Sequence, residues 1–114
     1  MTAPSAFAVD LLASISDELA EEGPLQTGTM FRSPGLRVGA KIFVFLGNHD
    51  RLIIKVPRVR AEHLIADGQA HPVTMGTRTL REWIAIPAGT DREETFIRWV
   101  ALAREALTYV REIS

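Results

Sequence analysis

Cysteine is absent from this chain of 114 residues. Without a thiol, the protein can form neither a disulfide bond nor a thiolate-ligated metal site. This absence excludes disulfide-stapled scaffolds and cysteine-based zinc modules, and it fits a reducing compartment.

Long hydrophobic runs are also lacking. The apolar segment from Ile42 to Leu46 is far shorter than the stretch of about 20 residues that a membrane-spanning helix needs. The segment from Met1 to Ala8 carries no basic side chain and leads into acidic ones, which does not fit a signal peptide. We therefore expect a cytoplasmic protein with no membrane partner.

The net charge is only −1, but the charges are unevenly distributed. Residues 1–27 carry five acids and no base, whereas residues 28–81 carry nine bases and three acids. Residues 82–114 carry four bases and six acids. A basic middle can attract anionic partners. The interpretation we prefer is that the acidic flanks neutralise it when the chain folds.

The composition is that of a globular domain, with 46% hydrophobic and 24% charged residues. The length suits one core, and no repeat, low-complexity tract or linker divides the chain. We expect a single domain over residues 1–114.

The first segment predicts an amphipathic helix that ends at Gly23 and Pro24, because glycine adopts the left-handed end conformation and proline cannot continue a helix. Its apolar residues recur at helical spacing: Phe7, Leu11, Leu12, Ile15 and Leu19.

Residues 28–56 are predicted to form strands. Residues 29–32 are a short candidate, and residues 36–38 begin another. Residues 41–46 and 51–56 form an antiparallel hairpin around a polar loop. In residues 41–46, simple alternation places Phe43 and Phe45 on one face and Val44 on the other. In residues 51–56 the same alternation sets Leu52, Ile54 and Val56 against Arg51, Ile53 and Lys55.

The second half of the chain predicts a short helix, two strands and a long helix. Pro57 suits a first helical turn, and Gly68 ends that helix. Strands follow over residues 71–75 and 80–86. Thr90 and Glu93 have the spacing of a capping box, with apolar residues at helical spacing after it.

The expected order is α-β-β-β-α-β-β-α. Because the strands are consecutive and the connections short, we expect an α+β fold of two layers, α-β(3)-α-β(2)-α. The sheet should be largely antiparallel, with helices packed on one face.

Four segments carry a family resemblance. They read MFRSPGL (residues 30–36), GAKIF (39–43), LIIKVP (52–57) and GTRTLREW (76–83). In this order and spacing the chain resembles the N-terminal domain of the TfoX/Sxy family over residues 28–110. Two departures are Arg32, where the family often has glycine, and Leu80, where it often has methionine.

The resemblance implies an α-β(3)-α-β(2)-α domain without known catalysis. It also implies an architecture shared with YjbR-like domains and similar to the secretion-chaperone-like fold. Full-length members of the family are linked to the regulation of competence genes, and only their N-terminal domain is matched.

The residues predict no catalytic site, no metal site and no cofactor. The three histidines, His49, His63 and His71, lie in separate segments, whereas a metal site needs several donors at one point. Asp50 beside His49 fits a turn better than an acid–base pair. Ser33 precedes Pro34 and makes no nucleophile elbow, and no glycine-rich phosphate loop occurs.

Five residues are candidates for binding an anion or a partner: Lys41, Lys55, Arg78, Arg81 and Trp83. In one interpretation they form an anion or nucleic-acid patch with Trp83 as a stacking platform. In the other, the cations occupy solvated sheet edges and Trp83 belongs to the core. We prefer the second interpretation, because the net charge is slightly negative.

The leading hypothesis is a non-enzymatic interaction and regulatory module that binds another protein or forms a homodimer. It requires an uncovered sheet face or an exposed apolar patch. The alternative is a nucleic-acid-binding regulator that uses the basic middle. A further alternative is a small-ligand binder or enzyme built around Glu82, Trp83, Arg78 and Arg81.

Overall fold

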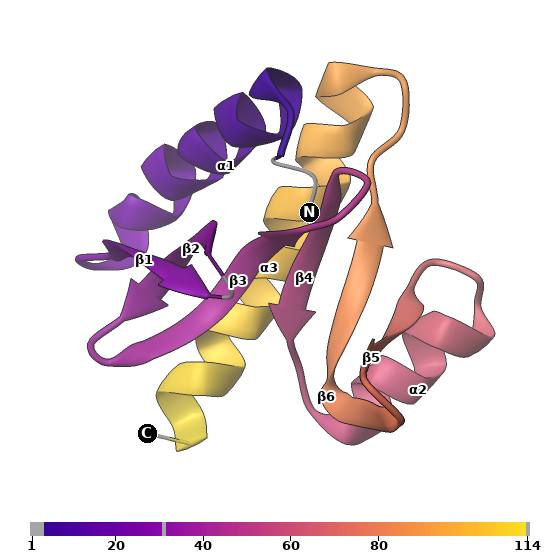
Figure 1. The fold of residues 1–114 in the computed structure, drawn as a ribbon. Helices are drawn as coiled ribbons and strands as arrows, with labels where there is room; N and C mark the ends of the chain where they lie inside the picture. Colours follow the sequence, from indigo (N-terminus) through magenta and orange to yellow (C-terminus); the bar gives the residue numbers. More distant parts are fainter. Residues whose placement is uncertain (1–3, 31, 114) are drawn as a thin grey trace.

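A computed structural model describes residues 4–30 and 32–113 of the chain (Figure 1). Within these ranges, no helix is both long enough and apolar enough to cross a bilayer. In chain order the elements are α1 (Ala6–Leu19), the 3-10 helix η1 (Ala20–Glu22), β1 (Gln26–Met30), β2 (Ser33–Val38), β3 (Lys41–Gly47), β4 (Arg51–Lys55), α2 (Arg58–Ala66), β5 (His71–Met75), β6 (Arg78–Pro87) and α3 (Arg92–Ile113).

The strands form one sheet in the order β1-β2-β3-β4-β6-β5, and every neighbouring pair is antiparallel. Helices α1 and α3 pack together and cover one face, with α3 behind β3 and β4 in Figure 1. The two-layer α+β class is therefore confirmed. Four strands precede α2, one more than in the expected α-β(3) pattern, because all four candidate segments of residues 28–56 form strands. The first of them spans Gln26–Met30 instead of residues 29–32. Phe31 of that candidate lies outside the described residues.

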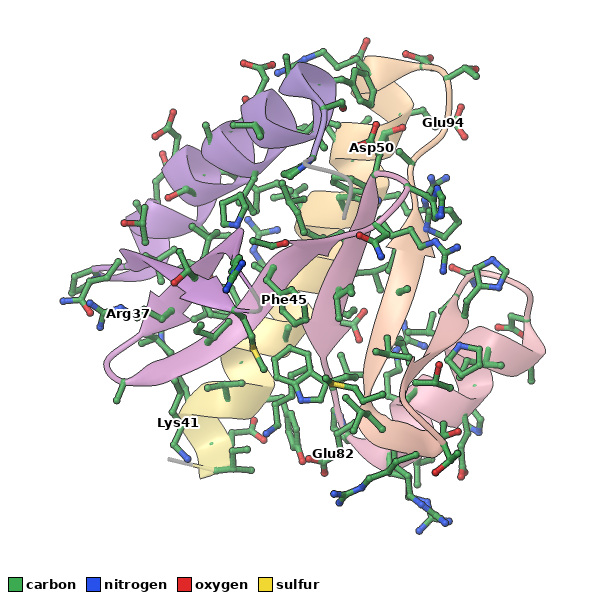
Figure 2. The ribbon with its side chains drawn as sticks, in the orientation of Figure 1. Arg37, Lys41, Phe45, Asp50, Glu82 and Glu94 are labelled. Carbon is green, nitrogen blue, oxygen red and sulfur yellow. The ribbon has the colours of Figure 1, made fainter. Side chains whose placement is uncertain are left out.

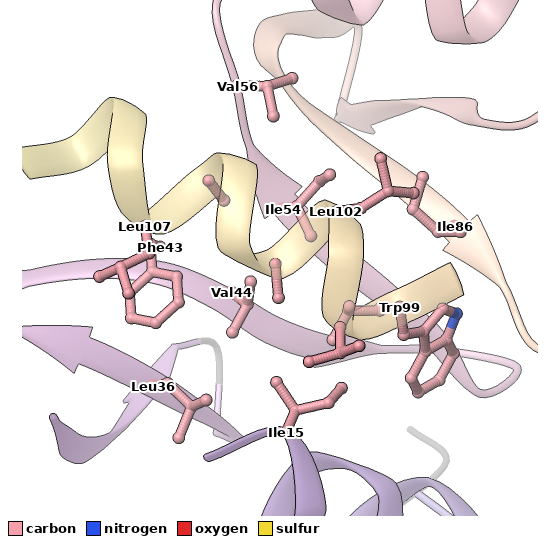
Figure 3. Close-up of a cluster of buried hydrophobic side chains, with 14 of the residues drawn as sticks. Ile15, Leu36, Phe43, Val44, Ile54, Val56, Ile86, Trp99, Leu102 and Leu107 are labelled. Carbon is pink, nitrogen blue, oxygen red and sulfur yellow. The ribbon is translucent and has the colours of Figure 1, made fainter. Parts of the chain in front are cut away.

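The main core lies between the sheet and the layer of α1 and α3. Figure 3 shows its side chains meeting from both layers. Trp99 of α3 is the largest of them and is fully buried. The other side chains labelled in Figure 3 are Ile15, Leu36, Phe43, Val44, Ile54, Val56, Ile86, Leu102 and Leu107.

Strand β3 departs from simple alternation. Phe43 was expected to face away from Val44, yet both side chains are buried in the main core. Leu36 of β2 pairs with Val44 of β3, but the next residue, Arg37, pairs with Ile42. The register therefore shifts at this point, and Phe43 has no partner in β2. Phe43 is thus the extra residue of a bulge, and a bulge turns the following side chain to the other face.

Helix α3 begins one residue later than the expected cap. The backbone N–H of Glu93 donates to Asp91 Oδ1 at 3.1 Å, so Asp91 caps this helix. The expected capping box from Thr90 to Glu93 was therefore wrong. Both residue types suit a cap, and the hydrogen bond from Glu93 assigns the cap to the aspartate.

The turn between β3 and β4 holds the start of α1. His49 and Asp50 both have positive φ, at 59° and 52°. Asp50 accepts hydrogen bonds from the Ser5 backbone N–H (3.2 Å) and the Ser5 hydroxyl (2.7 Å). The same hydroxyl accepts from Ala8 N–H and so caps α1. One carboxylate therefore fixes the first helix to the centre of the sheet.

Candidate functional site

Within residues 4–30 and 32–113, no helix covers the sheet face opposite α1 and α3, which is called here the open face. Figures 1 and 2 view the molecule from this side, and Phe45 lies near its centre. Its apolar side chains form a second cluster separate from the main core. They are Met30, Ile42, Phe45, Ile53, Val73, Trp83 and Ala85.

A hollow of about 340 Å³ lies on the open face and is called here the central hollow. Phe45, Ile53 and Ala85 line it from the middle strands. Met75 of β5 and Ser33 of β2 also line it, so strands from the two sides of the sheet enclose one cavity. A cavity of this volume can receive a side chain from another molecule.

Two glycines let the aromatic and aliphatic side chains of the open face lie flat against the strands. A Cβ atom at Gly47 would stand 2.5 Å from Ile53 Cδ1. A Cβ atom at Gly35 would stand 2.6 Å from the backbone oxygen of Val44 and 2.9 Å from Phe45 Cβ. A larger residue at Gly47 would push Ile53 outward and change the shape of the central hollow, whereas a larger residue at Gly35 would clash with the backbone of β3.

The rim of the open face is basic. Strand β4 alternates, so Arg51 and Lys55 share the face of Ile53, while Leu52 and Ile54 enter the main core. Arg51 also lines the central hollow. The six strands together contain six bases and a single acid, Glu82. That acid accepts a hydrogen bond from the Tyr109 hydroxyl of α3 at 2.6 Å, on the helical side.

The structure brings three of the five predicted site residues together. Lys55 and Trp83 are direct partners across β4 and β6, and Lys55 Nζ stands 5.6 Å from the centre of the indole ring. Trp83 also meets Phe45 edge-on, with ring centres 5.4 Å apart. Lys41 lines the same shallow hollow of about 330 Å³ as Lys55 and Trp83.

The other two predicted residues, Arg78 and Arg81, lie elsewhere. They line a groove of about 550 Å³ between α2 and the first part of β6. The suggested neighbourhood of Glu82 with these arginines is therefore divided. Glu82 approaches Tyr109 and Lys55, and its Oε1 is 4.0 Å from Lys55 Nζ. Sequence adjacency placed these groups together, whereas in the structure Arg78 and Arg81 line the groove beside α2 and Glu82 turns toward α3.

The acidic flanks do not neutralise most of the basic middle. The acids of the first helical segment pair instead with α3, through Arg92 to Asp10 and Arg104 to Glu22. Of the nine central bases, three pair with an acid: Lys55, Arg58 and Arg60. The remaining six have no ion pair within residues 4–30 and 32–113, which corrects our expectation. They are Arg32, Arg37, Lys41, Arg51, Arg78 and Arg81.

Titratable groups with a shifted pKa lie on the helical side. The hydrogen bond to Glu82 and, next, desolvation raise the pKa of Tyr109 above 10.0. The pKa of Arg60 is raised chiefly by its hydrogen bond to Glu105, and that of Arg104 by its hydrogen bond to Glu22. These are the contacts that hold helices together, and none of the three groups lines the central hollow.

The three histidines stay apart. His49 is in the β3–β4 turn, His63 in α2 and His71 at the start of β5. Among the residues that the structure describes, no group of three or more histidines or acids could hold a metal ion.

Sequence reasoning missed the central hollow and two arginines. Arg51 faces the hollow, and the alternation predicted for β4 was the available signal. Arg58 lines the groove with Arg78 and Arg81. No pattern in the sequence brings α2 against β6, because that contact depends on how the sheet bends.

The comparison with protein families agrees with this architecture. The family model described as the TfoX N-terminal domain matches residues 17–107. The match runs from the second half of α1 into α3 and includes the whole sheet. No curated protein sequence is significantly similar to this chain.

Proposed function

We propose, from the premise that this chain belongs to the TfoX N-terminal domain family, that it is a non-enzymatic regulatory module that binds a segment of another protein. The binding surface is the open face. The single observation that supports this proposal is an apolar cluster with a cavity at its centre, on a sheet face that no helix covers. Phe45, Ile53 and Ala85 are buried by their neighbours on this face, so the exposed apolar contact comes mainly from Met75, which is 42% exposed and lines the cavity. Apolar side chains that line a cavity are typical of binding sites.

The chemistry of the surface favours a partner segment that combines apolar and acidic side chains. Phe45, Ile53 and Met75 offer apolar contacts, and Arg51 at the rim has no acidic partner among the described residues. A second copy of this chain fits less well, because two open faces would bring two basic rims together. The partner is therefore a different protein, acting in the cytoplasm.

A nucleic acid is the second candidate, because six of the seven charged residues in the strands are basic. The contact between Lys55 and Trp83 argues against base stacking on this tryptophan. Lys55 Nζ lies over the indole ring, and a stacked base would have to displace it. We therefore place the nucleic acid among the outcomes of the test.

The test selects peptides from a random displayed library on the immobilised protein. A synthetic peptide of the selected sequence is then titrated into isotopically labelled protein, and the amide signals are followed by NMR. We expect the selected sequences to combine apolar residues with aspartate or glutamate. We also expect the amide signals of Phe45, Ile53 and Ala85 to shift most, because these residues line the central hollow. Shifts concentrated on α1 and α3 would contradict the proposal.

Two matched variants locate the binding surface. Met75 and Ile97 are both exposed apolar residues, at 42% and 59%, but only Met75 lines the central hollow. Met75→Glu should lower the affinity for the peptide about tenfold, which corresponds to about 1.4 kcal/mol, because the new carboxylate repels the acidic residues of the peptide. Ile97→Glu, on α3, should leave the affinity unchanged. Equal effects of the two variants would exclude the open face, and tighter binding of an oligonucleotide at the same residues would favour the second candidate.

A further inference from the structure

A groove between α2 and the first part of β6 gathers three arginines, and is called here the arginine groove. It has a volume of about 550 Å³. Of its lining residues, only Pro72 also lines the central hollow, so the two cavities are separate surfaces. The residues that matter for binding are Arg58, Ala61, Ile65, Arg78, Leu80 and Arg81.

The arginines of the groove outnumber the acidic side chains that could pair with them. Glu62 is its only acid, and this carboxylate already pairs with Arg58 at 3.3 Å. The side chains of Arg78 and Arg81 make no hydrogen bond or ion pair to any residue in the ranges 4–30 and 32–113. A guanidinium cannot lose its proton to relieve the repulsion between such neighbours. Two permanent charges in one groove therefore favour an anion between them.

The walls limit what that anion can be. Ala61, Ile65 and Leu80 give the groove an apolar side, so a bare inorganic ion would leave this surface unused. Arginine binds phosphate through two parallel N–H donors, and a phosphate monoester above its second pKa of about 6 carries close to two negative charges. Two unpaired arginines match that charge better than they match a single carboxylate.

We propose that the arginine groove binds a small phosphate monoester that carries an apolar group. Arg78 and Arg81 would hold the phosphate, and the apolar group would lie against Leu80 and Ile65. A long nucleic acid is the poorer occupant, because other unpaired bases such as Arg37 lie in β2, near the opposite edge of the sheet. The inference does not depend on the partner proposed for the open face.

The test uses phenyl phosphate as the probe and measures its affinity by calorimetry and by amide chemical shifts. We expect saturable binding that shifts the signals of residues 78–81 and weakens below the second phosphate pKa of about 6, where the probe loses one charge. Inorganic phosphate, which lacks the apolar group, and phenylacetate, which carries one charge, should both bind more weakly. Equal affinity for phenylacetate would overturn the assignment to a phosphate.

Substitutions of exposed arginines locate the site without endangering the fold. Arg81→Ala should lower the affinity about tenfold, as expected for loss of a charge-assisted hydrogen bond. Arg81→Lys keeps the charge but loses the paired donors, and should fall between the wild type and Arg81→Ala. The control is Arg51→Ala, an unpaired base of the central hollow, which should bind phenyl phosphate normally.

Three further results would overturn the inference. The first is an absence of saturable binding, and the second is an equal loss of affinity in Arg51→Ala and Arg81→Ala. The third is a single-stranded oligonucleotide that binds more tightly than phenyl phosphate and loses its affinity in Arg81→Ala, which would assign the groove to nucleic acid. Arg51→Ala changes the central hollow but not the arginine groove and should leave phenyl phosphate binding intact, so this test can fail or succeed separately from that of the open face.

Discussion

At the scale of single residues, backbone conformation explains one departure from the family pattern. Arg32, between β1 and β2, has a φ of 66°, and the resembling family often has glycine at this position. A residue with a Cβ atom adopts this left-handed conformation at a cost of about 1–2 kcal/mol, whereas glycine adopts it freely. The family glycine thus meets a requirement of the turn, which this chain satisfies with strain.

Replacement of Arg32 by glycine should therefore stabilise the fold. We expect Arg32→Gly to raise the free energy of unfolding by about 0.5–1 kcal/mol, after the greater flexibility of glycine in the unfolded chain is subtracted. Urea denaturation measures this change. Arg37→Gly is the contrasting variant, because Arg37 has no positive φ and donates to Thr27 O at 3.1 Å, and it should destabilise the protein. A loss of stability in Arg32→Gly would refute the explanation.

Tyr109 permits a prediction about alkaline pH, because it is the only tyrosine. Its hydroxyl donates to Glu82, and this hydrogen bond is the main cause of a pKa above 10.0. The neutral phenol is therefore favoured in the folded state. Its contribution to stability is complete below pH 10.0 and is lost as the pH rises through the folded pKa.

Tyrosinate absorbance of the intact protein measures that pKa directly. We expect ionisation of the wild type above pH 10.0, and a return toward this value in Glu82→Gln. Glu93→Gln, at the far end of α3, is the control and should titrate like the wild type. A midpoint that does not move in Glu82→Gln would show that the hydrogen bond is not the cause.

At the scale of elements, the β3–β4 turn and α1 form one unit through Asp50 and Ser5. Asp50→Ala removes two hydrogen bonds to Ser5. It also leaves alanine at a φ of 52°, an unfavourable conformation that its side chain cannot offset with a hydrogen bond. We expect a loss of about 2–3 kcal/mol of unfolding free energy. Urea denaturation of Asp50→Ala, Ser5→Ala and the double variant measures it.

The double variant is the decisive member of that set. Because Ser5 and Asp50 share their hydrogen bonds, the loss in the double variant should be smaller than the sum of the two single losses. Asp50→Gly separates strain from hydrogen bonding, since glycine accepts the positive φ, and it should cost less than Asp50→Ala. Additive losses would mean that the turn and α1 are not coupled.

The same scale shows where sequence patterns suffice. Residues 51–56 were predicted correctly with both faces, because a strand without bulges follows its period of two. Phe43 was placed on the wrong face, because its bulge depends on pairing with β2 rather than on its own segment. Lys55 and Trp83 were predicted separately as candidates, but their contact depends on the register of β4 against β6. Local patterns thus predict elements, and only the pairing of distant strands assembles the site.

At the scale of the whole molecule, the two layers carry opposite charge. The helical layer of α1, η1 and α3 contains nine acids and four bases, and the sheet contains one acid and six bases. The net charge of −1 therefore conceals a separation between the two faces. Ion pairs within the helical layer, such as Arg92 with Asp10, do not remove its negative surplus.

This separation predicts unusual behaviour on ion exchangers. Above its isoelectric point of about 6.3 the protein is net negative, yet the sheet should still hold it on a cation exchanger at low salt. The variant Arg51→Glu should elute earlier, while Arg92→Glu, which changes the helical layer by the same amount, should alter cation-exchange retention far less. Identical elution of the two variants would show that the resin responds to net charge alone.

The opposed layers also give the domain a large dipole moment despite its near neutrality. In the field of an acidic molecule such a dipole rotates until the sheet points forward, so collisions are oriented before any contact forms. Salt shortens the range of that field to about 8 Å at physiological ionic strength. Raising the ionic strength should therefore slow the association of an acidic ligand with the sheet. The lifetime of the complex should change little, because it depends on the apolar contacts around Phe45.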